Sequence, residues 1–316
     1  MRRVALIYNP ASGQHSGGRA SQVRDVIAVL HKAEIEAEAL ETHAPGSGKS
    51  LALAAVKQGY DTVLACGGDG TVHEVLQALV GTPVALGVIP LGTANALAQN
   101  LGLGRNPVKA MRALLNAESM QVPVGRIFFQ EPNGAQGWRF FTVAAGIGAD
   151  ALLMRSMDPA MKRRLGYALY MIEAFKIWVS HPFPLFDASF SINGNGEPRV
   201  EQVSQLLAIR IRSFGGALGV FAPGATLHKK DLSLVAFKTR SRLQYLRFLL
   251  ATVIGRQTFS RTIELLDADA VECRLANGSK SKVFVEADGE VLGALPARIE
   301  VARETLTLLV PSGARP

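Results

Sequence analysis

The segment Cys66 to Thr71, which reads CGGDGT, holds the residues with the clearest potential for chemistry. Its glycines would let the backbone approach a phosphate group closely and point N–H groups at it. A helix expected directly after the segment would add the positive end of its dipole. Asp69 places a carboxylate among those phosphates, which requires a divalent cation to offset its charge or a role in proton transfer. The segment therefore predicts a phosphate-binding loop, although a tight strand-to-helix turn would also explain the glycines.

Two further loops of small residues support a phosphate site. Asn9 to Gly13 follows the first apolar run of the chain, and Pro90 to Asn95 follows the fourth. Each offers backbone N–H groups or hydroxyls without bulky side chains, as a nucleoside triphosphate requires. Because all three loops follow expected strands, we expect them to line one edge of a sheet.

Two motifs that contain carboxylates have both a structural and a chemical interpretation. Thr71 and Glu74 match the S/T-x-x-E capping box, which predicts a structural role for Glu74. Asp288-Gly289 is typical of a hairpin turn. Glu290, the next residue, could instead accept the proton of an attacking hydroxyl. Spacing alone leaves both interpretations of Glu290 open.

Residues 1 to about 123 show the rhythm of an α/β domain. Apolar β-type runs alternate with segments of helical spacing. The expected strands are 4–8, 36–42, 62–66 and 84–89, and the expected helices are 22–33, 50–58 and 71–80. This order favours a parallel sheet with helices on both faces, and such sheets bind ligands outside the carboxyl ends of their strands.

From about residue 124 the pattern changes to β-like runs separated by turns. The expected strands are 140–144, 186–192, 205–212, 232–238, 283–286 and 298–301, with one helix at 166–179. The pattern favours an antiparallel sandwich or barrel. We therefore predict a nucleotide-binding α/β domain over 1–123 and a β-rich domain over 124–304.

Composition narrows the ligand class. Of the 316 residues, 48% are hydrophobic, so the chain can build packed cores. Its formal net charge of +8 favours polyanionic partners, which are nucleic acid, anionic lipid or phosphorylated ligands. No run approaches the roughly 20 apolar residues of a spanning helix, since Arg247 interrupts the strongest one, 243–255. Cys66 and Cys273 fit small buried core positions in a reducing cytosol.

The motifs as an ordered set resemble the diacylglycerol kinase catalytic-domain family, which includes sphingosine and ceramide kinases and bacterial lipid kinases. The resemblance covers nearly the whole chain and runs through residues 9–13, 67–71, 92–95, 146–150, 215–216, 222–223 and 288–290. It implies an enzyme that uses ATP and Mg²⁺ to phosphorylate a lipid hydroxyl. It also implies that a last strand within 305–316 returns to the nucleotide domain, and that a cleft separates this domain from a β-rich, lipid-binding one.

The resemblance also implies roles for individual residues. Asp69 would organise Mg²⁺ with the phosphates, and Glu290 matches the family's proton acceptor, with Asp69 as the alternative base. The residues that would bind ATP are Asn9, Ser12, Thr42, Gly67, Gly68, Asp69, Gly70, Thr71, Val72, His73 and Thr93.

Two departures from the family pattern bear on specificity. Ala96 follows GTAN where bacterial diacylglycerol kinases commonly have aspartate, and the run 92–98 with 72–74 is closer to the sphingosine kinase variant. Lys229 lies in the loop that carries a structural metal in some bacterial members. A lysine there disfavours a cation, so we predict that this second metal site is absent.

A membrane contact is expected because the acceptor is a membrane lipid. The basic run 162–164 precedes an apolar, aromatic helix that includes Phe175, Ile177 and Trp178. This combination favours peripheral docking on an anionic membrane, although a core helix with a solvated basic start is an alternative. We expect a cytoplasmic enzyme at the inner membrane surface, with no nucleic-acid partner.

Two other functions stay open at the level of sequence. An NAD kinase-like phosphotransferase would share GGDGT, but the GTAN and DGE motifs argue against it. A catalytically silent protein that binds nucleotide and lipid would explain Ala96 and Lys229. The sequence does not identify the lipid, which could be diacylglycerol, a sphingoid base, ceramide or phosphatidylglycerol. It also leaves open a homodimer through an edge strand and whether Asp150 contacts a headgroup or makes structural hydrogen bonds.

Overall fold

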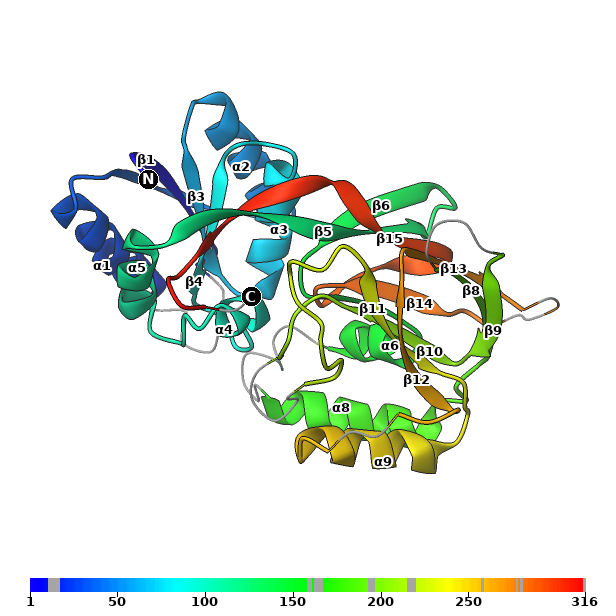
Figure 1. Cartoon of the computed structure of the whole chain (residues 1–316). Coiled ribbons are helices and arrows are strands. Elements are labelled where there is room, and N and C mark those ends of the chain that lie inside the picture. The colour runs from blue at the N-terminus through cyan, green and yellow to red at the C-terminus, as the bar shows by residue number, and fades with distance from the viewer. Residues whose placement is uncertain are drawn as a thin grey trace. The chain divides into compact units, whose positions relative to one another are not determined.

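The computed structural model describes residues 1–10, 18–157, 161, 167–192, 197–214, 220–256, 259–276, 278 and 281–314. They form two compact units, Met1–Val124 with Arg303–Pro316, and Gly125–Ala302. Strands β5 (Glu118–Gln130) and β15 (Glu290–Val310) contribute residues to both units. The predicted fold class, a parallel α/β unit and an antiparallel β-rich unit, is confirmed (Figure 1).

The first unit is built on a parallel sheet in the order β2-β1-β3-β4, extended by the last residues of β15 beside β4. Its helices and remaining strands follow one another along the chain. They are β1 (Arg3–Tyr8), α1 (Arg19–Lys32), β2 (Glu36–Glu41), α2 (Ser47–Lys57), β3 (Thr62–Gly67), α3 (Asp69–Leu79), β4 (Ala85–Pro90), α4 (Ala96–Asn100) and α5 (Pro107–Leu115).

Helices cover both faces of this sheet because its central strands are apolar on both sides. Every residue of β3 and β4 is buried. Helices α1 and α5 pack together on one face, and α2 and α3 pack together on the other (Figure 1). This two-sided burial explains the continuous apolar runs in the sequence, which are typical of parallel strands.

The second unit is antiparallel. Its strands and helices are β6 (Gln136–Phe141), β7 (Ala144–Ile147), α6 (Ala149–Ser156), α8 (Tyr167–Ser180), β8 (Phe186–Ser191), β9 (Arg199–Val203), β10 (Gln205–Ile209), β11 (Leu232–Phe237), α9 (Arg242–Val253), β12 (Ile263–Ala268), β13 (Ala270–Leu275) and β14 (Phe284–Ala287). One sheet has the order β12-β11-β10-β7-β14-β15, and β15 also pairs with β13, which continues to β8 and β9. Because β15 pairs with β14 up to Ala294 and with β13 from Ala297, it connects the two groups of strands.

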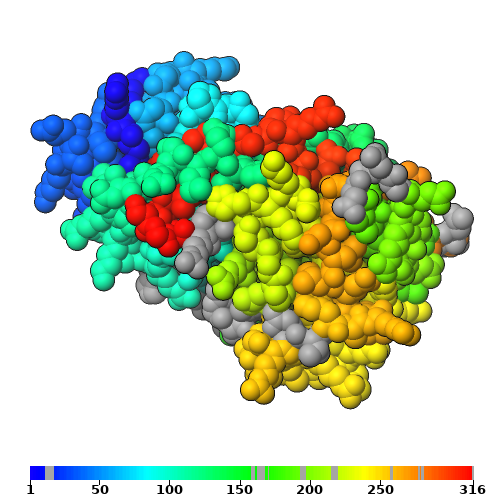
Figure 2. All heavy atoms as spheres, in the orientation of Figure 1, coloured from blue at the N-terminus to red at the C-terminus, as the bar shows by residue number. Residues whose placement is uncertain are grey.

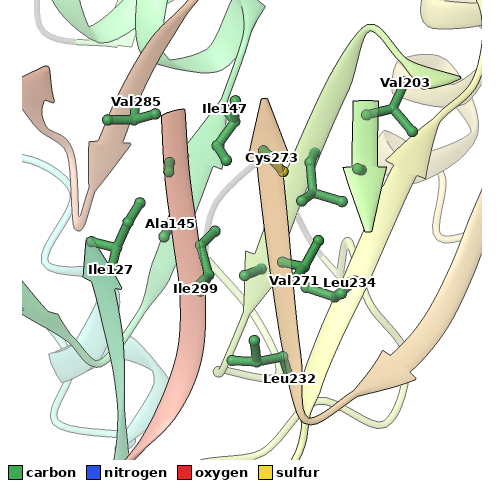
Figure 3. Packing of buried hydrophobic residues seen from close by; sticks show 14 of the residues in the cluster. Ile127, Ala145, Ile147, Val203, Leu232, Leu234, Val271, Cys273, Val285 and Ile299 are labelled. Carbon is green, nitrogen blue, oxygen red and sulfur yellow. The ribbon is translucent and has the colours of Figure 1, made fainter. Parts of the chain in front are cut away.

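An apolar core lies between these two groups of strands (Figure 3). Ile147 and Leu234 contribute from the first group, and Val271 and Cys273 contribute from β13. Cys66 and Cys273 are both fully buried, as predicted, and burial raises the pKa of both thiols. The alternating inward-facing residues of the strands therefore hold the unit together, as in other sandwiches.

Several element boundaries differ from the predictions. The run 140–144 is divided between β6 and β7, because the chain turns at Thr142 and Val143. The runs 298–301 and 305–310 belong to one strand of 21 residues, β15. Helix α3 begins at Asp69, two residues before the predicted start.

Candidate functional site

The register of the parallel sheet brings the predicted nucleotide loops to one edge. Tyr8 lies opposite both Glu41 and Cys66, and Gly67 lies opposite Pro90. The loops that follow these four strands therefore leave the same carboxyl edge, where they begin at Asn9, Thr42, Gly68 and Leu91. The N–H of Thr42 donates to the carbonyl of Tyr8 (2.9 Å), which fixes Thr42 at this edge.

Two of these loops pack so closely that their contact requires glycine. The N–H groups of Leu91 and Gly92 both donate to the carbonyl of Gly67, at 2.9 and 3.1 Å. A Cβ atom at Gly92 would lie 2.4 Å from the Cα of Gly68, and one at Gly67 would lie 2.3 Å from the hydroxyl of Thr71. The absence of side chains therefore lets the loops touch, in addition to allowing a ligand to approach the backbone.

Asp69 ties the glycine-rich loop to the GTAN loop. Its carboxylate accepts hydrogen bonds from the N–H groups of Asn95 (3.0 Å) and Ala96 (2.7 Å), where α4 begins. Asn95 adopts a left-handed conformation, with φ of 51°, and exchanges two hydrogen bonds with the backbone of Gly92. These two hydrogen bonds hold the carboxylate of Asp69 in a fixed position between the two loops.

The N-terminus of α3 supplies the expected backbone donors. Gly68 is the N-cap residue, and its carbonyl accepts from the N–H of Val72 (3.2 Å), so the first turn precedes Val72. The N–H groups of Gly70 and Thr71 in that turn point toward the helix N-terminus, where an anion binds well. The side chains of Val72 and His73 are buried. The predicted contact of these two residues with a nucleotide stays a prediction.

The capping box predicted for Thr71 and Glu74 is wrong. Because α3 starts at Asp69, Thr71 lies inside the helix and its side chain does not cap it. Glu74 instead accepts hydrogen bonds from the N–H groups of Gly46 (2.7 Å) and Gly48 (2.8 Å). It therefore satisfies the start of α2, a structural role that differs from the predicted one.

In the second unit, a hairpin positions Glu290. Asp288 and Gly289 both have positive φ (50° and 85°), which is the geometry of the tight turn that Asp-Gly favours. The buried carboxylate of Asp288 accepts from the N–H groups of residues 142–144, between 2.8 and 3.1 Å, and so anchors the turn. Glu290 is exposed at the first position of β15. The predicted turn is confirmed, and Asp69 and Glu290 belong to different units.

A pair of buried carboxyl groups lies next to this hairpin. Glu286 of β14 is 3% exposed, hydrogen-bonds to Asp150 of α6 and accepts from the N–H of Gly289 (2.8 Å). Both carboxyls occupy the space left by Gly146, where a Cβ would lie 2.0 Å from Asp150 Oδ2. Burial raises the pKa of both groups, and the charge of Asp150 raises the pKa of Glu286 further. The pair therefore holds a proton at a pH where isolated carboxyls are ionised.

Glu286 belongs to none of the sequence motifs described above. The signal was present, because a glutamate interrupts the apolar run 283–287 of a buried strand.

The loop around Lys229 is occupied by cations of the chain itself. The buried guanidinium of Arg210 donates to the carbonyls of Leu227 (3.2 Å), Lys229 (2.8 Å) and Asp231 (3.3 Å). The ammonium of Lys229 lies 2.5 Å from the carboxylate of Asp267. Burial lowers the pKa of Arg210 to about 10, so it remains charged at neutral pH. Arg210, which the sequence analysis did not single out, therefore places a positive charge where the loop carbonyls converge.

Some predicted residues cannot be placed. Ser12, the basic run 162–164 and Gly215-Gly216 lie outside the described residues. Thr93, in the GTAN loop, is partly exposed at the same edge as Asn9 and Thr42. Among the described helices, none combines the length and apolarity needed to span a bilayer.

Comparison with known proteins agrees with this geometry. The diacylglycerol kinase catalytic domain matches residues 3–127, and the YegS C-terminal NAD kinase beta sandwich-like domain matches residues 142–310. A diacylglycerol kinase of Mycobacterium tuberculosis (strain ATCC 25618 / H37Rv) is 29% identical over 315 residues, which cover 98% of this chain and 95% of the relative. A diacylglycerol kinase of Bacillus subtilis (strain 168) is 27% identical over 302 residues, covering 94% of this chain and 92% of the relative.

A solved structure supports the fold. The crystal structure of a diacylglycerol kinase from Bacillus anthracis str. Sterne has a TM-score of 0.70 to this chain at 17% identity, and covers 99% of this chain and 98% of that one. At that identity the likeness concerns the fold alone. The two domain matches together span most of the sequence, and the chain therefore belongs to the diacylglycerol kinase catalytic-domain family of lipid kinases, phosphotransferases with an alcohol group as acceptor.

Proposed function

We propose that this enzyme transfers the γ-phosphate of ATP to a hydroxyl group of a membrane lipid, with Mg²⁺ as the required cation. The observation that carries the proposal is the alignment of the glycine-rich loops at one edge of the parallel sheet, next to the N-terminus of α3. A triphosphate needs many backbone donors and little bulk, and this edge offers both.

In this proposal the first unit binds the nucleotide. Gly68, Gly70 and Thr71 hold the phosphates through backbone N–H groups and the helix N-terminus. Asn9, which begins the loop after β1, shapes a further phosphate loop, and Thr42, which begins the loop after β2, contacts the nucleotide. Ser12, Gly67, Val72, His73 and Thr93 complete the proposed set. The site leaves most of the catalytic work to positioning and charge neutralisation, as phosphoryl transfer generally does.

Asp69 fits the role of the Mg²⁺ partner. Mg²⁺ in kinases is usually held by one or two carboxylates together with substrate phosphates and water. Among the residues that the structure describes, no group of three or more His, Cys, Asp or Glu side chains could hold a metal. This agrees with a cation that binds together with the nucleotide phosphates, near Asp69. When bound, Mg²⁺ would neutralise charge on the transferred phosphoryl group.

Glu290 is the better candidate for the base. Both carboxylate oxygens of Asp69 already accept backbone N–H bonds, so a proton taken up there would displace one of these bonds. Glu290 is exposed, and the anchored Asp288-Gly289 turn fixes its backbone. We propose that Glu290 accepts the proton of the lipid hydroxyl as the hydroxyl attacks.

The acceptor is best sought first among diacylglycerols, because relatives aligned over nearly the whole chain are named diacylglycerol kinases. Sphingoid bases, ceramide and phosphatidylglycerol remain to be tested, since Ala96 and the neighbouring GTAN sequence are closer to the sphingosine kinase variant. The acceptor sits in a bilayer, so we also propose peripheral contact with an anionic membrane.

Labelled ATP, Mg²⁺ and extracted lipids in mixed micelles test the proposal. A labelled lipid should form, and Glu290→Gln should lower kcat by about 100- to 10,000-fold while ATP affinity is retained. NAD would be offered in a parallel reaction without lipid. Labelling of NAD alone, or ATP binding without any labelled lipid, would contradict the proposal. Full activity of Glu290→Gln would refute the role given to Glu290.

A further inference from the structure

Large apolar side chains that face solvent are concentrated on helices α8 and α9. Phe175 on α8 is 63% exposed, and Ile254, directly after α9, is 68% exposed. Nine of the fifteen exposed large apolar residues in the described part of the chain lie on α8, on α9 or directly after α9. We call the following set the α8–α9 face: Met171, Ile172, Phe175, Val179, Leu243, Leu249, Leu250, Val253 and Ile254.

Helix α9 carries apolar residues on both of its sides. Tyr245, Phe248 and Thr252 form the face that is buried in the second unit. At about 100° per residue, Leu250 and Ile254 lie on the opposite side of the helix. A helix on an aqueous surface normally carries polar residues on that side, so the exposed apolar side of α9 calls for a partner.

The two helices are joined to each other at one end. The indole N–H of Trp178 in α8 donates to the carbonyl of Arg242, the first residue of α9 (2.9 Å). The ring of Phe183, which follows α8, packs at a tilt on the ring of Tyr245 in α9, with the centroids 4.4 Å apart. Figure 1 shows α8 and α9 next to each other, and Figure 2 shows the yellow spheres of α9 at the surface. The two helices that carry the exposed apolar residues therefore lie next to each other in the second unit.

The chain segment that contains α9 is strongly basic. Residues 240–263 include five arginines and no aspartate or glutamate. Arg247 is exposed within α9, and Arg256 is exposed just beyond Ile254. An apolar surface bordered by arginines is complementary to the boundary between anionic headgroups and acyl chains.

We infer that the α8–α9 face docks on an anionic lipid bilayer, with its apolar side chains inserted below the headgroups and the arginines near α9 among them. This inference rests on the proposed function and adds α9 as a membrane contact. A second copy of the chain is a poorer partner, because a symmetric contact would bring the arginines of both copies together.

Vesicle binding tests the inference directly. The full chain would be mixed with vesicles of phosphatidylcholine and phosphatidylserine, which offer no hydroxyl acceptor of the proposed kind, and the bound fraction would be measured by flotation without ATP. The test variant is L250Q/I254Q, and the matched control is V200Q. Val200 is 64% exposed on β9 of the same unit but lies outside the α8–α9 face.

The double variant should bind vesicles about tenfold or more weakly than the wild type, since two exposed apolar side chains lose their insertion. The control should bind like the wild type, and all three proteins should melt alike because the changed side chains are exposed. High salt should weaken wild-type binding without abolishing it.

Equal vesicle binding by the double variant would overturn the inference. A wild-type dimer in sedimentation experiments that L250Q/I254Q converts to a monomer would also overturn it, because the face would then join two copies of the chain. Since the assay uses neither ATP nor an acceptor lipid, vesicle binding with no lipid phosphorylation would sustain the docking surface and count against the proposed function.

Discussion

The Asp69→Asn substitution should destabilise the first unit even when no metal or nucleotide is present. The two carboxylate oxygens of Asp69 accept from two different N–H groups, those of Asn95 and Ala96. An asparagine has one acceptor oxygen, so in either orientation its NH₂ group faces one of these N–H donors. The substitution therefore removes one hydrogen bond, weakens the other by loss of charge and brings two donors together.

The expected size follows from these two contacts. A hydrogen bond to a charged group contributes about 1.5–3 kcal/mol, and the carboxylate is partly exposed, so we expect a loss of about 2 kcal/mol. For a unit of this size that corresponds to a fall of roughly 5–8 °C in melting temperature. An additional role of Asp69 toward Mg²⁺ would appear separately, as a loss of activity beyond what instability explains.

Calorimetry in EDTA, without nucleotide, measures the first effect. Glu290→Gln is the matched control, because it also exchanges an acid for its amide but lies exposed in the other unit, and its melting temperature should not change. An unchanged melting temperature for Asp69→Asn would refute the structural tie between the two loops. The activity lost in that variant would then report on the metal or the proton alone.

Three further perturbations follow from the structure. Gly92→Ala should reduce ATP affinity at least tenfold, because the new Cβ would lie 2.4 Å from the Cα of Gly68. Gly68→Ala should have a milder effect in the same titration, because its Cβ would lie 3.3 Å from its nearest neighbour. Equal effects of the two substitutions would contradict this reasoning. Glu286→Gln should stabilise the protein increasingly as the pH rises from about 4 to 8, by about 1–3 kcal/mol at the upper end. Because the pKa of Glu286 is higher in the folded state than in the unfolded state, the folded wild type loses stability as the pH rises and Glu286 is forced to ionise. A glutamine does not ionise and avoids this loss. A difference in melting temperature that stays constant with pH would argue against this reasoning. Arg210→Met should lower the free energy of unfolding by about 3–5 kcal/mol, because three carbonyls lose their cationic partner. EDTA should leave the melting temperature of the wild type unchanged. A large fall of that temperature in EDTA would instead reveal a metal in the loop.

Much of the first unit could be predicted because its signals are local. Continuous apolar runs gave the buried strands β3 and β4, and the order of strands and helices gave the parallel sheet with its loops at one edge. The start of α3 could not be located in this way. Thr71 matched a capping pattern, but Gly68 takes the N-cap position with an extended backbone, and Glu74 bonds to a helix 26 residues earlier in the chain.

The second unit was harder to predict because its key contacts are distant in sequence. Strand β15 was expected as two runs, since Pro296 and several charged residues interrupt its pattern, and only its pairing with β14 and β13 shows it to be continuous. The contacts of Arg210 and the pairing of Glu286 with Asp150 depend on residues 17 to 136 positions away. The exposed apolar side of α9 is likewise a property of packing rather than of composition.

The guanidinium of Arg210 has a consequence for how the protein responds to its ionic surroundings. A bound metal stabilises a fold by mass action, so its contribution rises and falls with the free concentration of the ion. A cation on the chain itself is present in a fixed one-to-one amount and cannot be diluted, chelated or exchanged. The contacts that hold the loop at 227–231 to Arg210 therefore do not depend on the magnesium concentration. If the enzyme uses Mg²⁺ as proposed, its magnesium dependence should reflect catalysis at the nucleotide, without a contribution from the integrity of this loop.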